Sequence, residues 1–543
     1  MSENSVQEPV HAEPEAAADT QRGRRRALRV LGLVTIVLAL VICTSIGSVL
    51  VNVDWPGGAV AWLRVAVGAV LLTLALLCGE LLVRIIYDLR RGRHKDGNLD
   101  LLDRLGTALA KPKRIAVVLV AAVAWFLAVS LAPPVFSSPT PTPLLAPGEL
   151  VIMSAIDESP SDPRRVLIEQ WNQAHPENPV QVENVSGEPD AQHAAMVANA
   201  KGGRGPAADV YLLDVVWMTE FIERGYIRPF DPAGLSTDDF LPNVLRTCTD
   251  LYGHREGLWA LPLNSDAGLL YQRTDLPGVT EPATWDDMFG ATAKSTYTVV
   301  KNSAGGGKLE GANAAQLADE EVLVVTAFET MWAAGGEVVN EDGNPVFNDS
   351  KDEIVFDAGA LEGLGKLSAA YRDTGTVLPG ADKMDDNKAT VAFRNEQAVF
   401  MRNWPVAYDT LTTSDGKSSI AFDVADLPGD SVLGGQNLAI AESTGKPKAA
   451  QAFIEFLTSS ASQLILFEAG GFAPTRDSAY ANATRPYKDL LRGAVVGARL
   501  RPVMPYYTEF SKEFRKGITR ALRNDGVLEP DFPKQLAKIA NRR

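Results

Sequence analysis

Carboxylate side chains that directly follow predicted strands are the groups in this sequence best placed to do chemistry. Asp157 and Glu158 follow an apolar strand predicted at residues 149–155, and Asp214 follows one predicted at 208–213. Their oxygens can accept hydrogen bonds from a ligand. Because ligands of open α/β sheets bind outside the carboxyl ends of the strands, at the topological switch point, we expect these three carboxylates at a binding site.

Sequence motifs of catalysis are missing from the chain. GxSxG, HExxH and CxxC do not occur, and His175, His193 and His254 are too scattered in sequence to indicate a site. Carboxylate pairs are abundant, but at this Asp and Glu content their spacing alone does not indicate a glycosidase. The Gly-rich segment 303–311 lacks GxxxxGK[ST] and predicts a surface loop. We therefore expect no enzyme, no metal and no cofactor.

The elements that must position the carboxylates alternate in type. Strands are predicted at 149–155, 180–185 and 208–213, and amphipathic helices at 163–174 and 192–200. Such alternation indicates βαβ units and a largely parallel sheet. The fold class expected for this region is therefore α/β.

Charge and cysteine content restrict the class of partner. Residues 1–148 contain 15 Lys and Arg against 11 Asp and Glu, whereas the remainder contains 37 against 56. Nucleic acid and anionic lipid would be repelled by so acidic a region, so no nucleic-acid partner is expected. Cys43 and Cys78 lie in apolar runs, which leaves Cys248 alone in the soluble part and excludes a disulfide framework.

Three apolar segments in the first part of the chain predict transmembrane helices at about 30–53, 59–83 and 115–132. The first has no charge over about 24 residues, enough to cross a hydrocarbon core of ~30 Å. The second has Arg64 and Glu80 near its ends, where long side chains reach the interface.

The flanking charges predict how these helices are oriented. Residues 1–29, expected to be disordered, include an Arg cluster at 22–26, and the loop 84–114 is strongly basic, whereas 54–58 has no Lys or Arg. Basic loops remain in the cytoplasm. The N-terminus and 84–114 are therefore expected inside, and everything after the third helix outside. The Pro-rich stretch 133–148 predicts a semi-rigid spacer before a domain at 149–543.

Several segments resemble those of one family, the ABC-importer solute-binding proteins of the maltose/trehalose-binding type, and they occur in the family's order. The most specific match is GLWALPLNSDAGLLYQRTDL at 257–276. The others are LLDVVWMTEFIERGYIRPFD (212–231), TWDD (284–287), FRNEQAVFMRNWPVAY (393–408), LPGDSVLGGQNLAI (427–440), KAAQAFIEFLTS (448–459), GGFAPTR (470–476) and RPVMPYY (501–507). The resemblance covers residue 149 to the C-terminus and leaves the three apolar segments outside it.

This resemblance implies a two-lobed, hinged periplasmic-binding-protein fold (type II, Venus-flytrap) that closes on its ligand. Lobe one would comprise about 149–264 and 437–470, and lobe two about 265–434 and 471–543.

The resemblance also implies a sugar site. A sugar site needs carboxylates and amides beside an aromatic platform. Six residues of this sequence match the positions at which the family binds its ligand: Asp214, Asp266, Trp404, Gly434, Gly435 and Arg476. Tyr408 is a plausible second aromatic, and Asp157 and Glu158 match the first binding loop loosely.

Each match has a structural alternative. Asp214 could simply cap the helix that begins at Val215, Asp266 could be a hinge residue, and Trp404 could belong to the core. The chain also departs from the family, with Gln436 where an aromatic often follows the glycine pair and no aromatic-rich segment at 296–319. These departures leave room for a smaller or more polar ligand.

The resemblance implies a protein that delivers its ligand to the permease subunits of an ABC transporter. The alternatives are a membrane-anchored sensor with the same fold and, less favoured, an extracytoplasmic glycosidase.

Overall fold

The computed structural model describes residues 145–542, except for 158, 160, 204, 254, 304 and the segment 413–419. The expected transmembrane helices at 30–53, 59–83 and 115–132, the segments 1–29 and 84–114, and most of the spacer lie outside the described residues, as does Glu158. In the part of the chain that is described, no helix combines the length and the apolar character needed to cross a membrane.

The first of two sheets carries the strands predicted from the alternating pattern. Its order is β2-β1-β3-β10-β4, with β5 also paired to β10. The strands are β1 (Leu150–Ala155), β2 (Val180–Val185), β3 (Val210–Asp214), β4 (Ile227–Arg228), β5 (Ala260–Asp266) and β10 (Gly434–Ala441).

The expectation of a largely parallel sheet is correct for β1, β2 and β3 and wrong for the rest. β1 runs parallel to β2 and β3, whereas β10 runs antiparallel to β3, β4 and β5. The cause is the direction from which the chain returns. β10 enters from the second sheet at the edge where β3 ends, with Gln436 opposite Asp214 and Ile440 opposite Val210. It must therefore run against β3.

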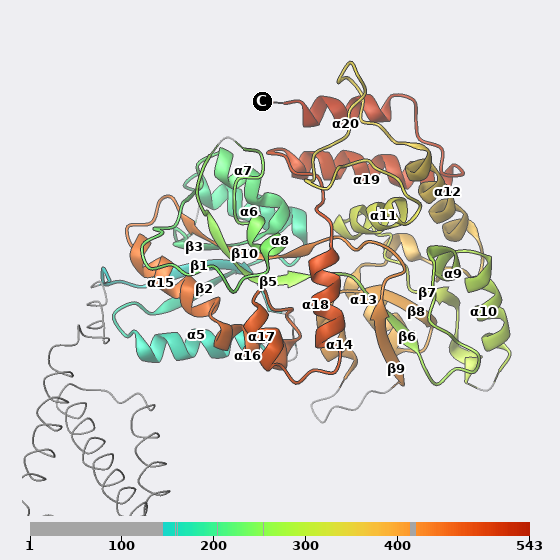
Figure 1. Cartoon of the computed structure of the whole chain (residues 1–543), viewed down its shortest axis with the longest axis horizontal. Helices are drawn as coiled ribbons and strands as arrows, with labels where there is room; N and C mark the ends of the chain where they lie inside the picture. Colours follow the sequence, from blue (N-terminus) through green and yellow to red (C-terminus); the bar gives the residue numbers. More distant parts are fainter. Residues whose placement is uncertain are drawn as a thin grey trace, which may run out of the picture. The chain divides into compact units, whose positions relative to one another are not determined.

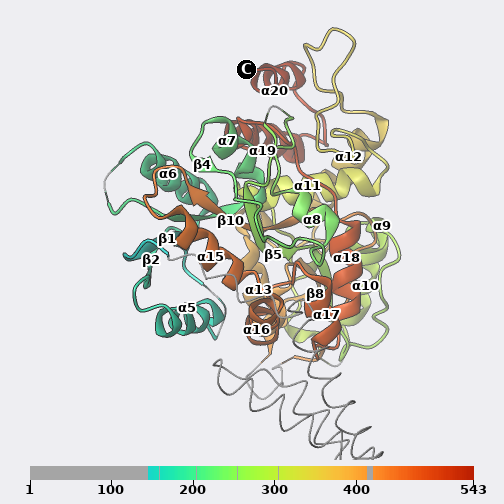
Figure 2. The same ribbon diagram turned by 60° about the vertical axis from the view of Figure 1, so that its left-hand side comes forward.

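Helices cover both faces of the first sheet because its strands β1 and β3 are apolar on both sides (Figures 1 and 2). Ile152 and Leu212 pack with α5, α15 and α16, and Met153 and Leu213 pack with α6 and α7. The helices of this half are α5 (Pro163–Ala174), α6 (Pro189–Ala200), α7 (Met218–Glu223), α8 (Pro242–Arg246), α15 (Pro447–Leu457) and α16 (Ser460–Gly470), with the 3₁₀ turn η1 (Val215–Trp217).

The second sheet has the order β7-β8-β6-β9 and is mainly antiparallel. Its strands are β6 (Leu269–Arg273), β7 (Gly311–Asn313), β8 (Ala398–Asn403) and β9 (Phe422–Asp426). Helices in this half are α9 (Trp285–Phe289), α10 (Ala291–Lys301), α11 (Glu321–Ala333), α12 (Ala358–Arg372), α13 (Asp386–Arg394), α14 (Val406–Leu411), α19 (Tyr507–Arg523) and α20 (Phe532–Ala540), with the 3₁₀ turns η2 (Gly306–Lys308) and η3 (Ala381–Lys383).

We call the first sheet with its helices lobe one and the second sheet with its helices lobe two, and the protein is therefore a two-lobed α/β structure. The chain crosses between the lobes from β5 to β6 and from β9 to β10, so Asp266 and Gly434 face each other at the crossing. A shared core joins the lobes there, in which β6 and β8 pack with α8, α16, α17 (Asp477–Asn482) and α18 (Lys488–Gly497).

Candidate functional site

The glycine pair that begins β10 brings a carboxylate and an indole together. Gly434 pairs with Asp266, and a Cβ atom on Gly434 would lie 3.2 Å from the Cβ of Asp266 and 3.3 Å from ring carbons of Trp404. Gly435 has φ +119°, and its Cβ would lie 2.4 Å from the carbonyl oxygen of Asn264. Larger residues would force these groups apart, so the two glycines permit the close approach.

Trp404 is held at its backbone and at its ring. Its backbone N–H donates to Asn403 Oδ1 at 2.8 Å, and the guanidinium of Arg402 lies 3.8 Å from the ring centroid. The indole is also close enough to Asp386 to lower the pKa of that carboxyl, against the larger effect of burial. A guanidinium over an aromatic face is attracted by the ring quadrupole. The indole therefore has a fixed orientation, with Arg402 against one face.

Arg402 is itself fixed by a buried ion pair with α11. Its Nε and Nη2 donate to the two carboxylate oxygens of Glu329 at 3.0 and 2.7 Å, in the two-pronged geometry that suits guanidinium and carboxylate. Glu329 is fully buried and also accepts from the backbone N–H of Val432 at 3.1 Å. Helix α11 thus determines where the indole at the end of β8 lies.

Burial and neighbouring charge perturb the carboxylates near the indole. Burial, and to a lesser extent the nearby charge of Asp214, together raise the pKa of Asp266 to about 8 against the opposing effect of Arg402. Burial likewise raises the pKa of Asp386 to about 6. At neutral pH the Asp266 carboxyl is therefore mostly protonated and can both donate and accept hydrogen bonds.

The carboxylate of Asp214, at the end of β3, already accepts two hydrogen bonds within the protein. It accepts from the backbone N–H of Val216 at 3.1 Å, which is the capping role that the sequence left open, and from Nη2 of Arg501 at 3.0 Å. Arg501 comes from lobe two and also donates to Glu321 at 2.8 Å. One guanidinium therefore connects carboxylates of both lobes.

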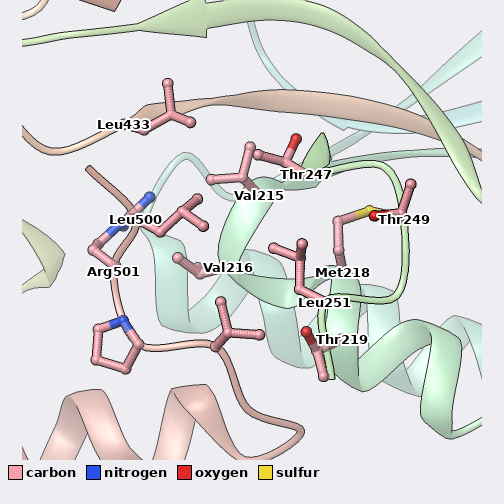
Figure 3. A pocket seen from close by; sticks show the side chains of 12 residues that line it. Val215, Val216, Met218, Thr219, Thr247, Thr249, Leu251, Leu433, Leu500 and Arg501 are labelled. Atoms are coloured by element: carbon pink, nitrogen blue, oxygen red, sulfur yellow. The ribbon is translucent and has the colours of Figure 1, made fainter. Parts of the chain in front are cut away.

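Two cavities lie between the lobes, and each has room for about one water molecule. The larger, of about 20 Å³, lies where Val215 and Val216 of lobe one face Leu500 and Arg501 of lobe two (Figure 3). The smaller, of about 10 Å³, is lined by Asp214 among others. Neither cavity holds a sugar in this arrangement of the lobes, so a ligand of that size would enter here only after the lobes have parted.

Arg476 lies in a different environment from the residues around Trp404. Its guanidinium lies 3.7 Å from the ring centroid of Phe240, its Nε donates to the carbonyl of Thr458 at 2.6 Å, and it pairs with Asp239 at 3.7 Å. These contacts all lie within the part of the chain around α8, α15 and α17. The described packing of Arg476 gives it a role in joining those segments and does not bring it to Asp214 or Trp404.

Tyr408 and Asp157 are also engaged elsewhere. The ring of Tyr408 packs against Phe422 and, at 4.5 Å between centroids, against Tyr487. Asp157 pairs with Arg164 at 3.2 Å, where it fastens the loop after β1 to the start of α5. The structure thus brings together Asp214, Asp266, Trp404, Gly434 and Gly435 of the predicted set, and it does not bring these two to them.

Sequence reasoning missed the charged partners of the site. Arg402, Glu329, Asp386, Arg501 and Glu321 were not expected there. A signal existed for two of them, because Arg402 within an apolar strand (AVFMRN) and Glu329 in the middle of an apolar helix (EVLVVTAFETMWA) have to be paired when buried. Nothing in the sequence indicated that Arg501 and Glu321 would meet Asp214.

Taken together, two α/β lobes linked by crossing strands, with polar groups and an indole at the crossing, define the class of hinged binding proteins. Among the described residues no three His, Cys, Asp or Glu side chains are grouped as metal ligands. The chain belongs to the bacterial extracellular solute-binding proteins, because the model of that family matches residues 167–490.

Known proteins of similar sequence or structure agree with this class. A probable ABC transporter-binding protein of Deinococcus radiodurans is 24% identical over 398 residues, which is 67% of this chain and 87% of the relative. The structure of T. maritima MalE3 with bound maltose has 26% identity and a TM-score of 0.61, and the match covers 72% of this chain and 98% of that one. A Thermotoga lettingae solute-binding protein with bound α-D-tagatose has 20% identity and a TM-score of 0.60 and covers 72% and 99%.

Proposed function

We propose that this protein captures a small carbohydrate-like ligand outside the cell and delivers it to the permease of an ABC transporter. The observation that carries the proposal is the convergence of Asp266, Trp404 and Gly434 at the crossing between two lobes, with Asp214 close enough to act on the pKa of Asp266. Carboxyl groups that accept from hydroxyls beside an aromatic face are what a sugar requires. The maltose and α-D-tagatose bound by two proteins of similar structure support the same ligand class.

Capture would operate by closure of the lobes. A ligand stabilises the closed form only by the difference between its affinities for the two forms. Contacts made by both lobes at once supply such a difference, and Asp214 lies in lobe one whereas Trp404 lies in lobe two. The site residues that we propose are Asp214, Asp266, Trp404, Gly434 and Gly435.

The membrane arrangement is part of this proposal. The apolar segments at 30–53, 59–83 and 115–132 would anchor the chain, and the basic flanks would keep the N-terminus in the cytoplasm. The Pro-rich stretch 133–148 would then hold the binding domain off the outer face of the membrane. An anchored binding protein would remain near its permease without a lipid anchor.

Ligand binding can be tested on the full-length chain in detergent, with maltose, tagatose and other mono- and disaccharides as probes. A sugar present at about 100 times its dissociation constant should stabilise the domain by roughly 2.7 kcal/mol, visible as a higher melting temperature. Trp404→Ala should raise the dissociation constant of that sugar about tenfold or more. The proposal is wrong if no carbohydrate shifts the melting temperature.

Comparing two aspartates that both cap helical segments distinguishes a role of Asp214 in ligand binding from its role as a cap. Asp214 and Asp357 each accept a backbone N–H at the start of a helical segment, at 3.1 and 2.8 Å, and Asp357 lies at the start of α12. Loss of either cap should cost about 1 kcal/mol, and Asp214→Ala should cost more in total because it also removes a partner of the buried Arg501. Asp214→Ala should in addition weaken sugar binding, whereas Asp357→Ala should leave the dissociation constant unchanged. Equal effects of the two substitutions on binding would remove Asp214 from the site.

A further inference from the structure

Arg501 crosses the boundary between the lobes as a buried ion pair. Its side chain is 3% exposed, and it reaches Asp214 of lobe one at 3.0 Å and Glu321 of lobe two at 2.8 Å. The carboxylates are 26% and 16% exposed, so it is the guanidinium that would be left buried with less opposite charge if either carboxylate moved away. The contact therefore resists separation of the lobes.

Lobe two holds Arg501 more firmly than lobe one does. Glu321, which anchors the guanidinium, also accepts from the hydroxyls of Tyr507 and Ser511, the latter at 2.8 Å. Glu321 and Asp214 each accept one hydrogen bond from Arg501, at 2.8 and 3.0 Å, but the backbone of Arg501 itself belongs to lobe two. When the lobes part, Arg501 should therefore stay with Glu321, and the contact to Asp214 is the one that breaks.

A second arginine repeats this arrangement beside the first. Arg515 of α19 is 5% exposed, donates to Asp190 of α6 at 2.8 Å, and is held in lobe two by the carbonyl of Asp319 at 2.8 Å. The cavity of about 10 Å³ has both Asp190 and Asp214 in its wall. Two further cross-lobe pairs, Arg246 with Asp342 and Lys512 with Asp190, are more exposed and contribute little.

The guanidinium of Arg501 keeps an unused donor. Its Nε is buried and has no hydrogen-bond partner among the described residues, although Arg501 lines the cavity of about 20 Å³. Buried guanidinium N–H groups are ordinarily satisfied. This donor is available to an oxygen of water or of a ligand that enters between the lobes.

We propose that Arg501 latches the lobes together in the unliganded protein by occupying Asp214, so that ligand binding is an exchange at that carboxylate. The identification of Asp214 as a ligand group rests on the proposed function, whereas the latch itself does not. A ligand that takes Asp214 must supply hydrogen-bond donors in place of the guanidinium, as a hydroxyl group does, because an acceptor-only ligand would leave the carboxylate unpaired. Arg501, still held by Glu321, can then donate to an adjacent ligand oxygen.

The latch can be tested without any ligand by measuring the distance between the lobes. Spin labels would be attached to Val182→Cys in lobe one and Val527→Cys in lobe two, which are 39% and 59% exposed. In the full-length chain Cys43 and Cys78 would be replaced by Ser, and Cys248 is fully buried and can remain. Pulsed electron–electron double resonance in detergent should give a single short distance between the two labels in the parent protein. Arg501→Gln should add a population at longer distance.

Arg499→Gln is the matched control, because Arg499 lies two positions away and pairs with Glu337 and Asp430 of lobe two alone, at 2.9 and 3.2 Å. Its distance distribution should equal that of the parent. Asp214→Asn removes the other end of the latch while Arg501 keeps Glu321, so it decides the question if Arg501→Gln does not fold. Distributions for Asp214→Asn and Arg501→Gln that superimpose on the parent would overturn the proposal.

Stopped-flow association of maltose, followed by tryptophan fluorescence, tests the exchange. If about nine molecules in ten are latched, association should be about tenfold faster in Arg501→Gln than in the parent. An unchanged association rate would overturn the exchange at Asp214. A complete lack of binding by every sugar would contradict the proposed function instead, and the ligand-free distance measurement would still decide the latch.

Discussion

At the scale of single residues, the main feature of the candidate site is the strongly raised pKa of the Asp266 carboxyl group. Asp266 is a carboxyl group at the crossing between the lobes, and burial beside Asp214 raises its pKa to about 8. Two carboxylates that are close together in a poorly solvated place do not both ionise readily. At neutral pH the proposed site would therefore contain a neutral carboxyl at Asp266 beside the carboxylate of Asp214, which is paired with Arg501.

The raised pKa of Asp266 predicts how stability depends on pH. Because the folded state holds this proton more tightly than the unfolded state, the contribution of Asp266 to stability should be greatest near pH 4 and fall as pH rises to about 8. Asp266→Asn should remove that part of the decline, so that the variant gains on the parent between pH 5 and pH 8. Melting temperatures measured across this range by circular dichroism check the prediction. Parallel curves for parent and variant would contradict it.

The backbone conformation of Gly435 predicts that replacing it with a larger residue lowers the stability of the protein. With φ +119° and no room beside Asn264, Gly435→Ala should destabilise the protein by more than about 1 kcal/mol. Gly445→Ala is the control, because no atom lies within 4 Å of its added Cβ and its φ is not positive. That substitution should change the free energy of unfolding by less than about 0.5 kcal/mol. Chemical denaturation of both variants distinguishes the two cases.

At the scale of elements, helix α11 and strand β8 together determine where Trp404 lies. The helix contributes Glu329 and the strand contributes Arg402, and their ion pair is almost completely buried. A buried pair of this kind does not have to add net stability, but breaking it by removing one partner is costly. The pair therefore fixes the position of β8 relative to α11, and this also fixes the backbone that carries Trp404 two residues later.

Arg402→Met tests this pairing. The substitution leaves Glu329 buried and unpaired, so we expect a loss of about 3–5 kcal/mol in the free energy of unfolding. The control is Lys308→Met, which breaks the exposed pair with Glu396 and should cost less than about 1 kcal/mol. Urea denaturation measures both losses. Similar costs for the two substitutions would contradict the proposed role of the buried pair.

At the scale of the whole molecule, an acidic two-lobed binding domain follows a basic, apolar N-terminal part. The charge difference suits the arrangement that we propose, with the basic segments on the cytoplasmic side of the membrane and the acidic domain on the outer side. The lobes are joined on the crossing side by a shared apolar core. Elsewhere they meet through ion pairs and through Val216 of lobe one, which packs against the core of lobe two. The shared core holds the hinge together, whereas the ion pairs can be exchanged for contacts to a ligand.

Deletion of residues 1–137 tests the proposed anchor. The full-length chain should sediment with membranes after cell lysis, and the deletion variant should remain in the supernatant because it lacks the three apolar segments. Both should show the same melting temperature for the binding domain. Recovery of the full-length chain in the supernatant would contradict membrane anchoring.

Much of the local structure could be predicted from the sequence. The helix at 163–174 and the strand at 180–185 have the predicted bounds, because hydrophobic period and flanking Pro residues define them locally. The helix expected at 192–200 begins three residues earlier at Pro189, because Glu188 accepts backbone N–H groups of Asp190 and Ala191 and caps it. Local signals of this kind needed no knowledge of distant residues.

The sequence by itself determined the α/β character, the two-lobed class and the position of Asp214 at a strand end, because each follows from neighbouring residues or from motifs in order. The tertiary structure decided which charges meet. Arg501 is 287 residues from Asp214 in the chain, and Arg402 is 73 from Glu329. The antiparallel direction of β10 and the partners of Arg476 were decided in the same way. Such pairings depend on how the whole chain is brought together in three dimensions, and no local pattern of hydrophobicity or spacing encodes them.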